Sequence, residues 1–117
     1  MSKNILKDKS YAFAVEIVKL TQVLVSNKKE YVISKQLLRS GTAIGALIRE
    51  AEFAQSKKDF ISKMSISLKE ANETFYWIDL IKDTGYIDIT IHKQLSSNAK
   101  ELVAMLVSSI KTTKSRL

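Results

Sequence analysis

The chain contains no cysteine and no proline, and only three of its 117 residues are glycine. Without cysteine it forms no disulfide, carries no thiol nucleophile and has no thiolate ligand for zinc. Proline removes a backbone donor and breaks helices, so its absence permits long uninterrupted helices. Three glycines are too few for the many turns of an all-β fold. These absences favour an all-α protein.

Long apolar runs are also missing. No stretch approaches the roughly 20 apolar residues that a membrane-spanning helix needs. The lysines near the N-terminus are not followed by the apolar segment of a secretory signal. We therefore expect a soluble, cytoplasmic protein with no membrane partner. At this length we expect one domain, and a hydrophobic content of 45% supplies its core.

The charge is strongly one-sided, with a formal net charge of +7. Such a surplus suits a polyanionic partner such as RNA or DNA, and the alternative is a solvated lysine surface without a ligand. Six cations are candidate nucleic-acid-binding residues: Lys28, Lys29, Arg39, Lys57, Lys58 and Lys63. The two lysine pairs flank opposite ends of one predicted helix. They therefore form no single patch on a monomer, although a ring of subunits would align each pair into a basic rim.

Hydrophobic periodicity predicts four amphipathic helices. They cover residues 8–27, 32–55 and 57–84, and a last segment that starts at Asp88 or Thr90. We expect Asp8 and Ser56 to be N-caps and Gly85 to end the third helix in a left-handed conformation. Short connections between long helices predict an antiparallel up-down-up-down four-helix bundle. The alternative is a pair of helical hairpins that must dimerise.

The first helix carries two apolar stripes. The main stripe is Phe13, Ile17, Leu20 and Leu24, and the second is Ala14, Val18, Thr21 and Val25. So wide an apolar face is typical of a helix that is buried against more than one neighbour. On the third helix, Phe75, Tyr76 and Trp77 are consecutive and cannot all face the core. These features and Leu47 indicate a homo-oligomer, with Leu47, Tyr76 and Trp77 as its candidate interface residues.

The second helix contains Gly41 and Gly45 four residues apart. Each costs about 1 kcal/mol of helix propensity relative to alanine, and we expect close packing of another backbone in return. A phosphate-binding glycine loop is excluded because neither glycine belongs to a recognised phosphate-loop spacing. For Arg49 and Glu50 we favour a packing role, with Arg49 bridging to Glu70 or Glu73, over a grip on phosphate.

Enzymatic motifs are weak in this sequence. A bundle di-metal site uses Glu-x-x-His motifs, but Ile89 stands three residues before His92, which is the only histidine. We expect His92 to be a surface residue, and a single histidine without an evident nucleophile is a poor basis for a hydrolytic triad. The sequence therefore predicts no catalytic residue, metal, cofactor or small-molecule substrate.

The middle of the chain resembles a bacterial family. The matching segments are RSGT at 39–42, IGA at 44–46, IREA at 48–51, KDFI at 58–61 and LKEANET at 68–74. They resemble the four-helix bundle proteins encoded by intervening sequences of large-subunit ribosomal RNA genes, formerly labelled a ribosomal-protein family. A related branch comprises the accessory proteins of diversity-generating retroelements, which work with a reverse transcriptase and nucleic acid. Leu47 stands where the family usually has asparagine, and Ala43 where it usually has serine.

The resemblance implies short antiparallel bundles that assemble into closed rings, often pentamers. We therefore expect a non-enzymatic homo-oligomeric bundle that acts as a nucleic-acid-binding or scaffold module. The alternative is a protein-binding or purely structural oligomer with no role in nucleic-acid binding.

Overall fold

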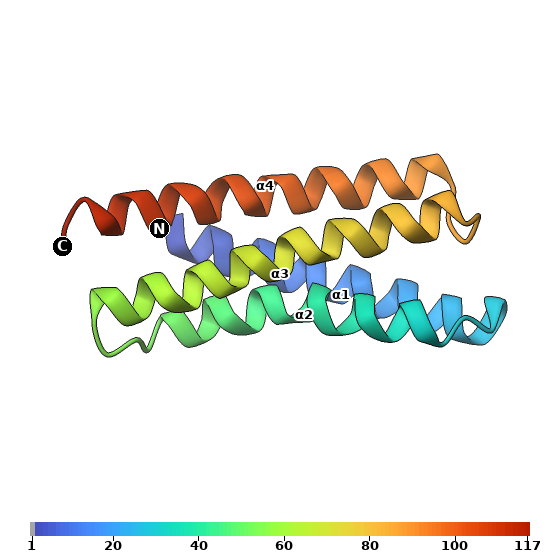
Figure 1. Cartoon of the computed structure of the whole chain (residues 1–117), viewed down its shortest axis with the longest axis horizontal. Helices are drawn as coiled ribbons and strands as arrows, with labels where there is room; N and C mark the ends of the chain where they lie inside the picture. Colours follow the sequence, from blue (N-terminus) through green and yellow to red (C-terminus); the bar gives the residue numbers. More distant parts are fainter. Residues whose placement is uncertain (1) are drawn as a thin grey trace.

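The computed structural model describes residues 2–117, with side chains from residue 5 onward, and these residues form four helices. The helices are α1 (Ser2–Lys28), α2 (Val32–Ala51), α3 (Lys57–Asp83) and α4 (Ile89–Lys114). They form a rod of 48 × 21 × 21 Å (Figure 1). The predicted all-α four-helix bundle is confirmed.

Contacts between distant residues fix the direction of each helix. Gly45 of α2 meets Ser10 of α1, Thr74 of α3 donates a hydrogen bond to Ser40 of α2, and Lys57 of α3 meets Arg116 beyond α4. Neighbouring helices therefore run in opposite directions, as in an up-down-up-down bundle. Within the described chain, no helix has the length and apolar content needed to cross a bilayer.

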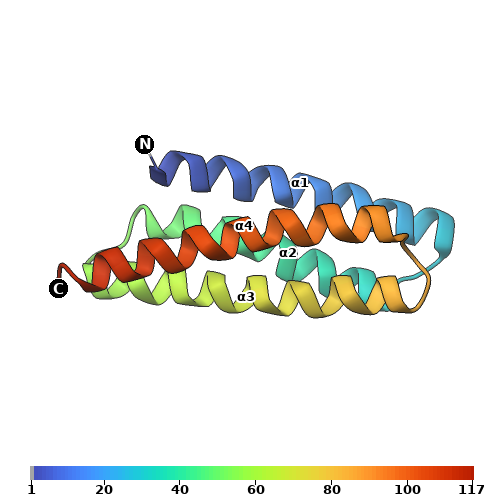
Figure 2. The same cartoon turned by 90° about the horizontal axis from the view of Figure 1, so that it is seen from above.

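The main apolar stripe of α1 lies in or against the core. On α2 the buried positions include Leu37, Gly41, Ile44, Ile48 and Ala51. Packing is closest between successive helices and sparser between α1 and α4. Figure 2 shows that the first turns of α1 diverge from α4. The backbones of α1 and α4 are therefore farther apart at that end of the rod than at the other.

The first helix begins earlier than predicted. Asp8 was expected to cap it, but α1 starts at Ser2 and Asp8 is exposed within the helix. Leu6 is buried in the core, so apolar packing extends the helix beyond the position where a polar residue suggested its start.

The second helix ends earlier than predicted, at Ala51 and not near Gln55. The cap of α3 explains the difference. Ser56 Oγ accepts a hydrogen bond from the Asp59 backbone N–H, which confirms Ser56 as the N-cap. The Asp59 carboxylate in turn accepts from the Gln55 N–H at 3.1 Å, so Gln55 belongs to the cap of the next helix. The hydrogen bond from the Gln55 backbone N–H, followed by that from the Lys63 ammonium, lowers the pKa of the Asp59 carboxyl below its ordinary value.

The connection between α3 and α4 follows the prediction. Gly85 has φ +85°, a left-handed conformation that favours glycine. The N–H of Tyr86 donates to the Ile81 carbonyl and the N–H of Gly85 to that of Lys82, as in a Schellman C-cap. Of the two starts proposed for α4, the structure selects Asp88, whose carboxylate accepts from the Ile91 N–H at 2.8 Å.

The sharp connection between α1 and α2 depends on Glu30. Its carboxylate accepts hydrogen bonds from the backbone N–H groups of Val32, Ile33 and Ser34 and from the Ser34 hydroxyl. Burial would raise the pKa of Glu30, but these hydrogen bonds outweigh it and lower the pKa below its ordinary value. Lys29, with φ +57°, turns the chain so that Glu30 faces the start of α2. Glu30 therefore serves as the cap of α2.

Candidate nucleic-acid interface

Five exposed cations lie where α3 begins and α4 ends. We call this group the cationic end; it comprises Lys57, Lys58, Lys111, Lys114 and Arg116. All five residues are exposed. Because α3 and α4 are antiparallel, the first turn of α3 lies beside the last turn of α4, at the left in Figure 1. Lys57 Nζ donates to the backbone carbonyl of Arg116 at 2.8 Å, which holds the two segments together.

The cations of the cationic end are available to bind an anion. Among the residues with described side chains, none of the five cations of the cationic end makes an ion pair. Two carboxylates nearby already have partners, since Glu52 pairs with Lys7 and Asp59 with Lys63. Unpaired ammonium and guanidinium groups on one end form an anion-attracting surface.

The six cations proposed from the sequence do not form one surface. Lys57 and Lys58 belong to the cationic end, and Lys63 is close by but pairs with Asp59 at 3.2 Å. Lys28 and Lys29 lie at the other end of the rod. Arg39 lies on α2, where its guanidinium contacts Glu73 and lies 3.2 Å from Glu70 Oε1. Arg39 is therefore a link between α2 and α3.

The opposite end of the rod has mixed charge. Lys28, Lys29, Lys82 and Lys93 lie there together with Glu30, Asp79, Asp83 and Asp88. Lys29 Nζ donates to the Ser26 carbonyl, and Lys82 pairs with Asp83. The surplus of positive charge is thus concentrated at the cationic end.

Arg49 does not form the bridge proposed for it. Among the described side chains it is Arg39 that pairs with Glu70 and Glu73, whereas Arg49 is exposed and lies over the Tyr11 ring, 5.9 Å from its centroid. The reason is angular: on α2, Arg49 projects toward α1 and away from α3. Glu50 is also exposed and lines a hollow between α1 and α2, which Arg49 lines as well.

Gly41 and Gly45 lie where α2 crosses α1. A Cβ atom on Gly41 would come within 2.9 Å of Ile17 Cγ1, and one on Gly45 within 3.3 Å of the Ser10 carbonyl oxygen. The missing side chains therefore let the two helices approach closely.

The outer side of the same helix pair is hollowed and apolar. One hollow of about 430 Å³ is lined by Tyr11, Ala14, Gly45, Ala46 and Phe53, among others. A second, of about 550 Å³, is lined by Thr21, Val25, Tyr31 and Leu38, among others. The second apolar stripe of α1 runs along both. We call this surface the α1–α2 face; Phe53 is its most exposed apolar side chain, at 81%.

The three proposed interface residues lie elsewhere. Leu47 and Trp77 are half-buried, and the Trp77 indole N–H donates to Glu73 at 3.0 Å. Tyr76 is exposed and packs edge-on against Trp77. Of the three, Tyr76 alone offers a largely free surface, and their role in assembly stays a prediction.

The structure also places His92, which was expected at the surface. Its side chain is only 15% exposed, and Nε2 lies 2.8 Å from Asp79 Oδ1, so His92 joins α4 to α3. Among the described residues no three histidine or acidic side chains are grouped closely enough to hold a metal ion.

Comparison with known proteins identifies the family of this chain. The model of the 23S rRNA-intervening sequence proteins matches residues 2–108. The chain belongs to this family. A member of the S23 ribosomal protein family from Bacteroides thetaiotaomicron, described as a protein of unknown function, has a solved structure with 53% sequence identity and a TM-score of 0.93. The match covers 95% of this chain and 99% of that one, and no curated protein matches.

Membership of the 23S rRNA-intervening sequence protein family confirms the resemblance found in the sequence, while a link to retroelement accessory proteins stays a prediction. The cations of α4 were not among the candidate binding residues predicted from the sequence. The predicted topology could have indicated them, because an up-down bundle places the end of the fourth helix beside the start of the third.

Proposed function

We propose that this chain is a non-enzymatic module that binds nucleic acid through the cationic end and self-associates through the α1–α2 face. The observation that carries the proposal is the junction of Lys57 with the Arg116 backbone, which unites the cations of two helices. Phosphate contacts supply most of the sequence-independent affinity for nucleic acids. The name of the family, which refers to 23S rRNA, makes structured RNA the first probe.

The test compares two variants that lose the same number of charges. The first replaces Lys57, Lys58, Lys111 and Lys114 with glutamine, and the control replaces Lys28, Lys29, Lys82 and Lys93. Fluorescence anisotropy with labelled structured RNA and duplex DNA, titrated with salt, measures affinity. We expect the first variant to bind at least ten-fold more weakly at low salt. Its log–log salt slope on duplex DNA should fall by up to about 3.6, since each of the four lost phosphate contacts contributes about 0.9.

The control variant should keep its affinity within about three-fold, because screening limits the reach of distant charges to about 10 Å at 0.1 M salt. Equal losses in both variants would show that net charge alone matters and would remove the cationic end as a site. Absence of binding by the parent protein at low salt would favour the alternative, a protein-binding or structural oligomer.

Self-association is supported by the α1–α2 face. It combines two adjoining apolar hollows with protruding side chains such as Phe53, and large exposed apolar patches mark sites of association. A second copy of the chain supplies both the hollows and the protruding side chains that fill them. A closed ring, with five subunits as the resemblance implies, would repeat each cationic end around one rim.

A single charge on this face should break the assembly. Ala46 is exposed and lines one hollow, so Ala46→Glu leaves the fold of the monomer intact but places a bulky carboxylate in the interface, where its desolvation opposes association. We expect association to weaken at least ten-fold, measured by sedimentation equilibrium. The control is Ala104→Glu, at an exposed position on α4. A parent protein that stays monomeric at millimolar concentration would contradict the proposal.

A further inference from the structure

The core is open at the cationic end, and the opening forms a cavity. About 390 Å³ of space lies between the beginnings of α1 and α3 and the ends of α2 and α4. Its apolar wall includes Leu6, Ile48, Phe60 and Met64, so all helices except α4 supply large apolar groups. Small residues, Ala51, Ala54 and Ser109, leave the middle unfilled.

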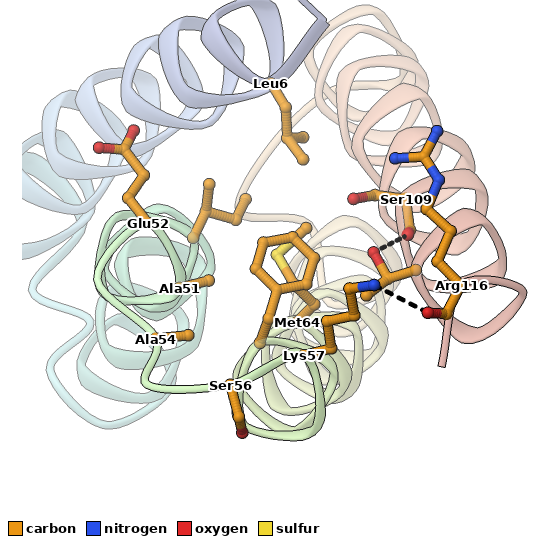
Figure 3. Close-up of a pocket in the computed structure, with 12 residues that line it drawn as sticks. Leu6, Ala51, Glu52, Ala54, Ser56, Lys57, Met64, Ser109 and Arg116 are labelled. Carbon is orange, nitrogen blue, oxygen red and sulfur yellow. Dashed lines mark hydrogen bonds between the residues drawn. The ribbon is translucent and has the colours of Figure 1, made fainter.

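Charge at the mouth of this cavity is mostly positive. Figure 3 shows Lys57 and Arg116 at the rim and Leu6, Met64 and Ser109 around the hollow. The only carboxylate in the lining, that of Glu52, turns toward α1 and pairs with Lys7 at 3.3 Å. The Lys57 ammonium has three N–H donors. One of them donates to the Arg116 carbonyl, and the other two can donate to a ligand.

We infer that this cavity binds a medium-chain carboxylate, with the alkyl chain between the four helices and the carboxylate at Lys57 and Arg116. An apolar cleft with a few convergent polar groups is the usual form of a small-molecule site, and its volume lies in the lower part of the usual range of about 300–1,000 Å³. At roughly 30 Å³ per group, the space that a water molecule takes in the liquid, about 13 non-hydrogen atoms fit in the cavity of about 390 Å³. Octanoate, with its eight carbon and two oxygen atoms, is small enough to fit. This inference goes beyond the proposed binding of nucleic acid, because it concerns the apolar interior.

The experiment is isothermal titration calorimetry of the full chain with octanoate, octanol and butyrate. We expect octanoate to bind with a Kd on the order of 0.1 mM or tighter, given ordinary affinities per ligand atom. Butyrate, which fills less of the cavity, should bind at least ten-fold more weakly. Octanol, which lacks the charge, should bind at least about five-fold more weakly than octanoate. No heat and no saturation with octanoate at millimolar concentration would overturn the inference.

Ser109→Leu and Lys57→Gln test separately how the cavity and the positive charge contribute to octanoate binding. Ser109→Leu fills the cavity and should abolish octanoate binding, whereas Ser108→Leu, at the exposed neighbouring position, should leave it unchanged. Lys57→Gln should weaken octanoate about five-fold and leave octanol unchanged. Equal effects of the two leucine variants, or equal affinity of the parent protein for octanoate and octanol, would refute the assignment. Ser109→Leu keeps every charge, so its RNA binding tests the proposed function separately, and circular dichroism verifies its fold.

Discussion

Replacing Gly41 with valine is expected to lower the free energy of unfolding by about 2–3 kcal/mol, the upper part of the range of about 1–3 kcal/mol for overpacking a filled core. The Cβ atom alone would come within 2.9 Å of Ile17 Cγ1. Ile17 is fully buried and branched at Cβ, so it has little freedom to turn away. The gain in helix propensity over glycine is below 1 kcal/mol and does not offset the clash. Urea denaturation at one fixed protein concentration measures the change.

The control for this substitution is Ala104→Val, at an exposed position of α4 away from the α1–α2 face, which should cost about 0.5 kcal/mol through propensity alone. A double variant adds a second check. Ile17→Ala creates a cavity next to Gly41, so the combined loss in Gly41→Val/Ile17→Ala should be smaller than the sum of the single losses. Strict additivity, or a Gly41→Val protein as stable as the parent, would show that Gly41 does not set the distance between α1 and α2.

Replacing Glu30 with alanine is expected to cost about 2 kcal/mol at pH 7, the upper end of the range for loss of a helix cap. The substitution leaves the N–H groups of Val32, Ile33 and Ser34 without their acceptor. Glu30→Gln keeps an acceptor oxygen but not the charge, so it should lose about half as much. The matched control is Glu101→Ala, which removes an exposed ion pair with Lys9 and should cost no more than 1 kcal/mol.

The same residue predicts a pH dependence. Folding lowers the pKa of Glu30, so its ionised form stabilises the native state above the ordinary carboxyl pKa of about 4.3. This contribution is lost as the pH falls through the lower pKa of the folded state. The parent protein should therefore lose more stability than Glu30→Ala between pH 5 and pH 3. Parallel stability curves over this range would contradict the assigned role of Glu30.

Local signals in the sequence predicted much of the fold. Ser56, Gly85 and Asp88 marked helix ends correctly, because caps and left-handed turns depend on a few neighbouring residues. The start of α1 was wrong, since burial of Leu6 outweighed the polar signal of Asp8. The sequence did not predict that Glu30 caps α2. This cap requires a positive φ at Lys29, and the residue type of Lys29 gives no indication of that conformation.

The candidate sites depended more on tertiary structure. Which arginine reaches Glu70 and Glu73 is decided by the facing angles of α2 and α3, and these select Arg39 over Arg49. The junction of Lys57 with Arg116 joins residues 59 positions apart. The second stripe of α1, visible in the sequence, lies along the α1–α2 face.

The most direct test of nucleic-acid binding at the cationic end is amide hydrogen exchange of the parent protein with and without structured RNA. We expect added protection in the segments 52–60 and 108–117, with little change at 26–35 and 80–92. Protection confined to the latter segments, or none anywhere under conditions of saturating RNA, would contradict this expectation.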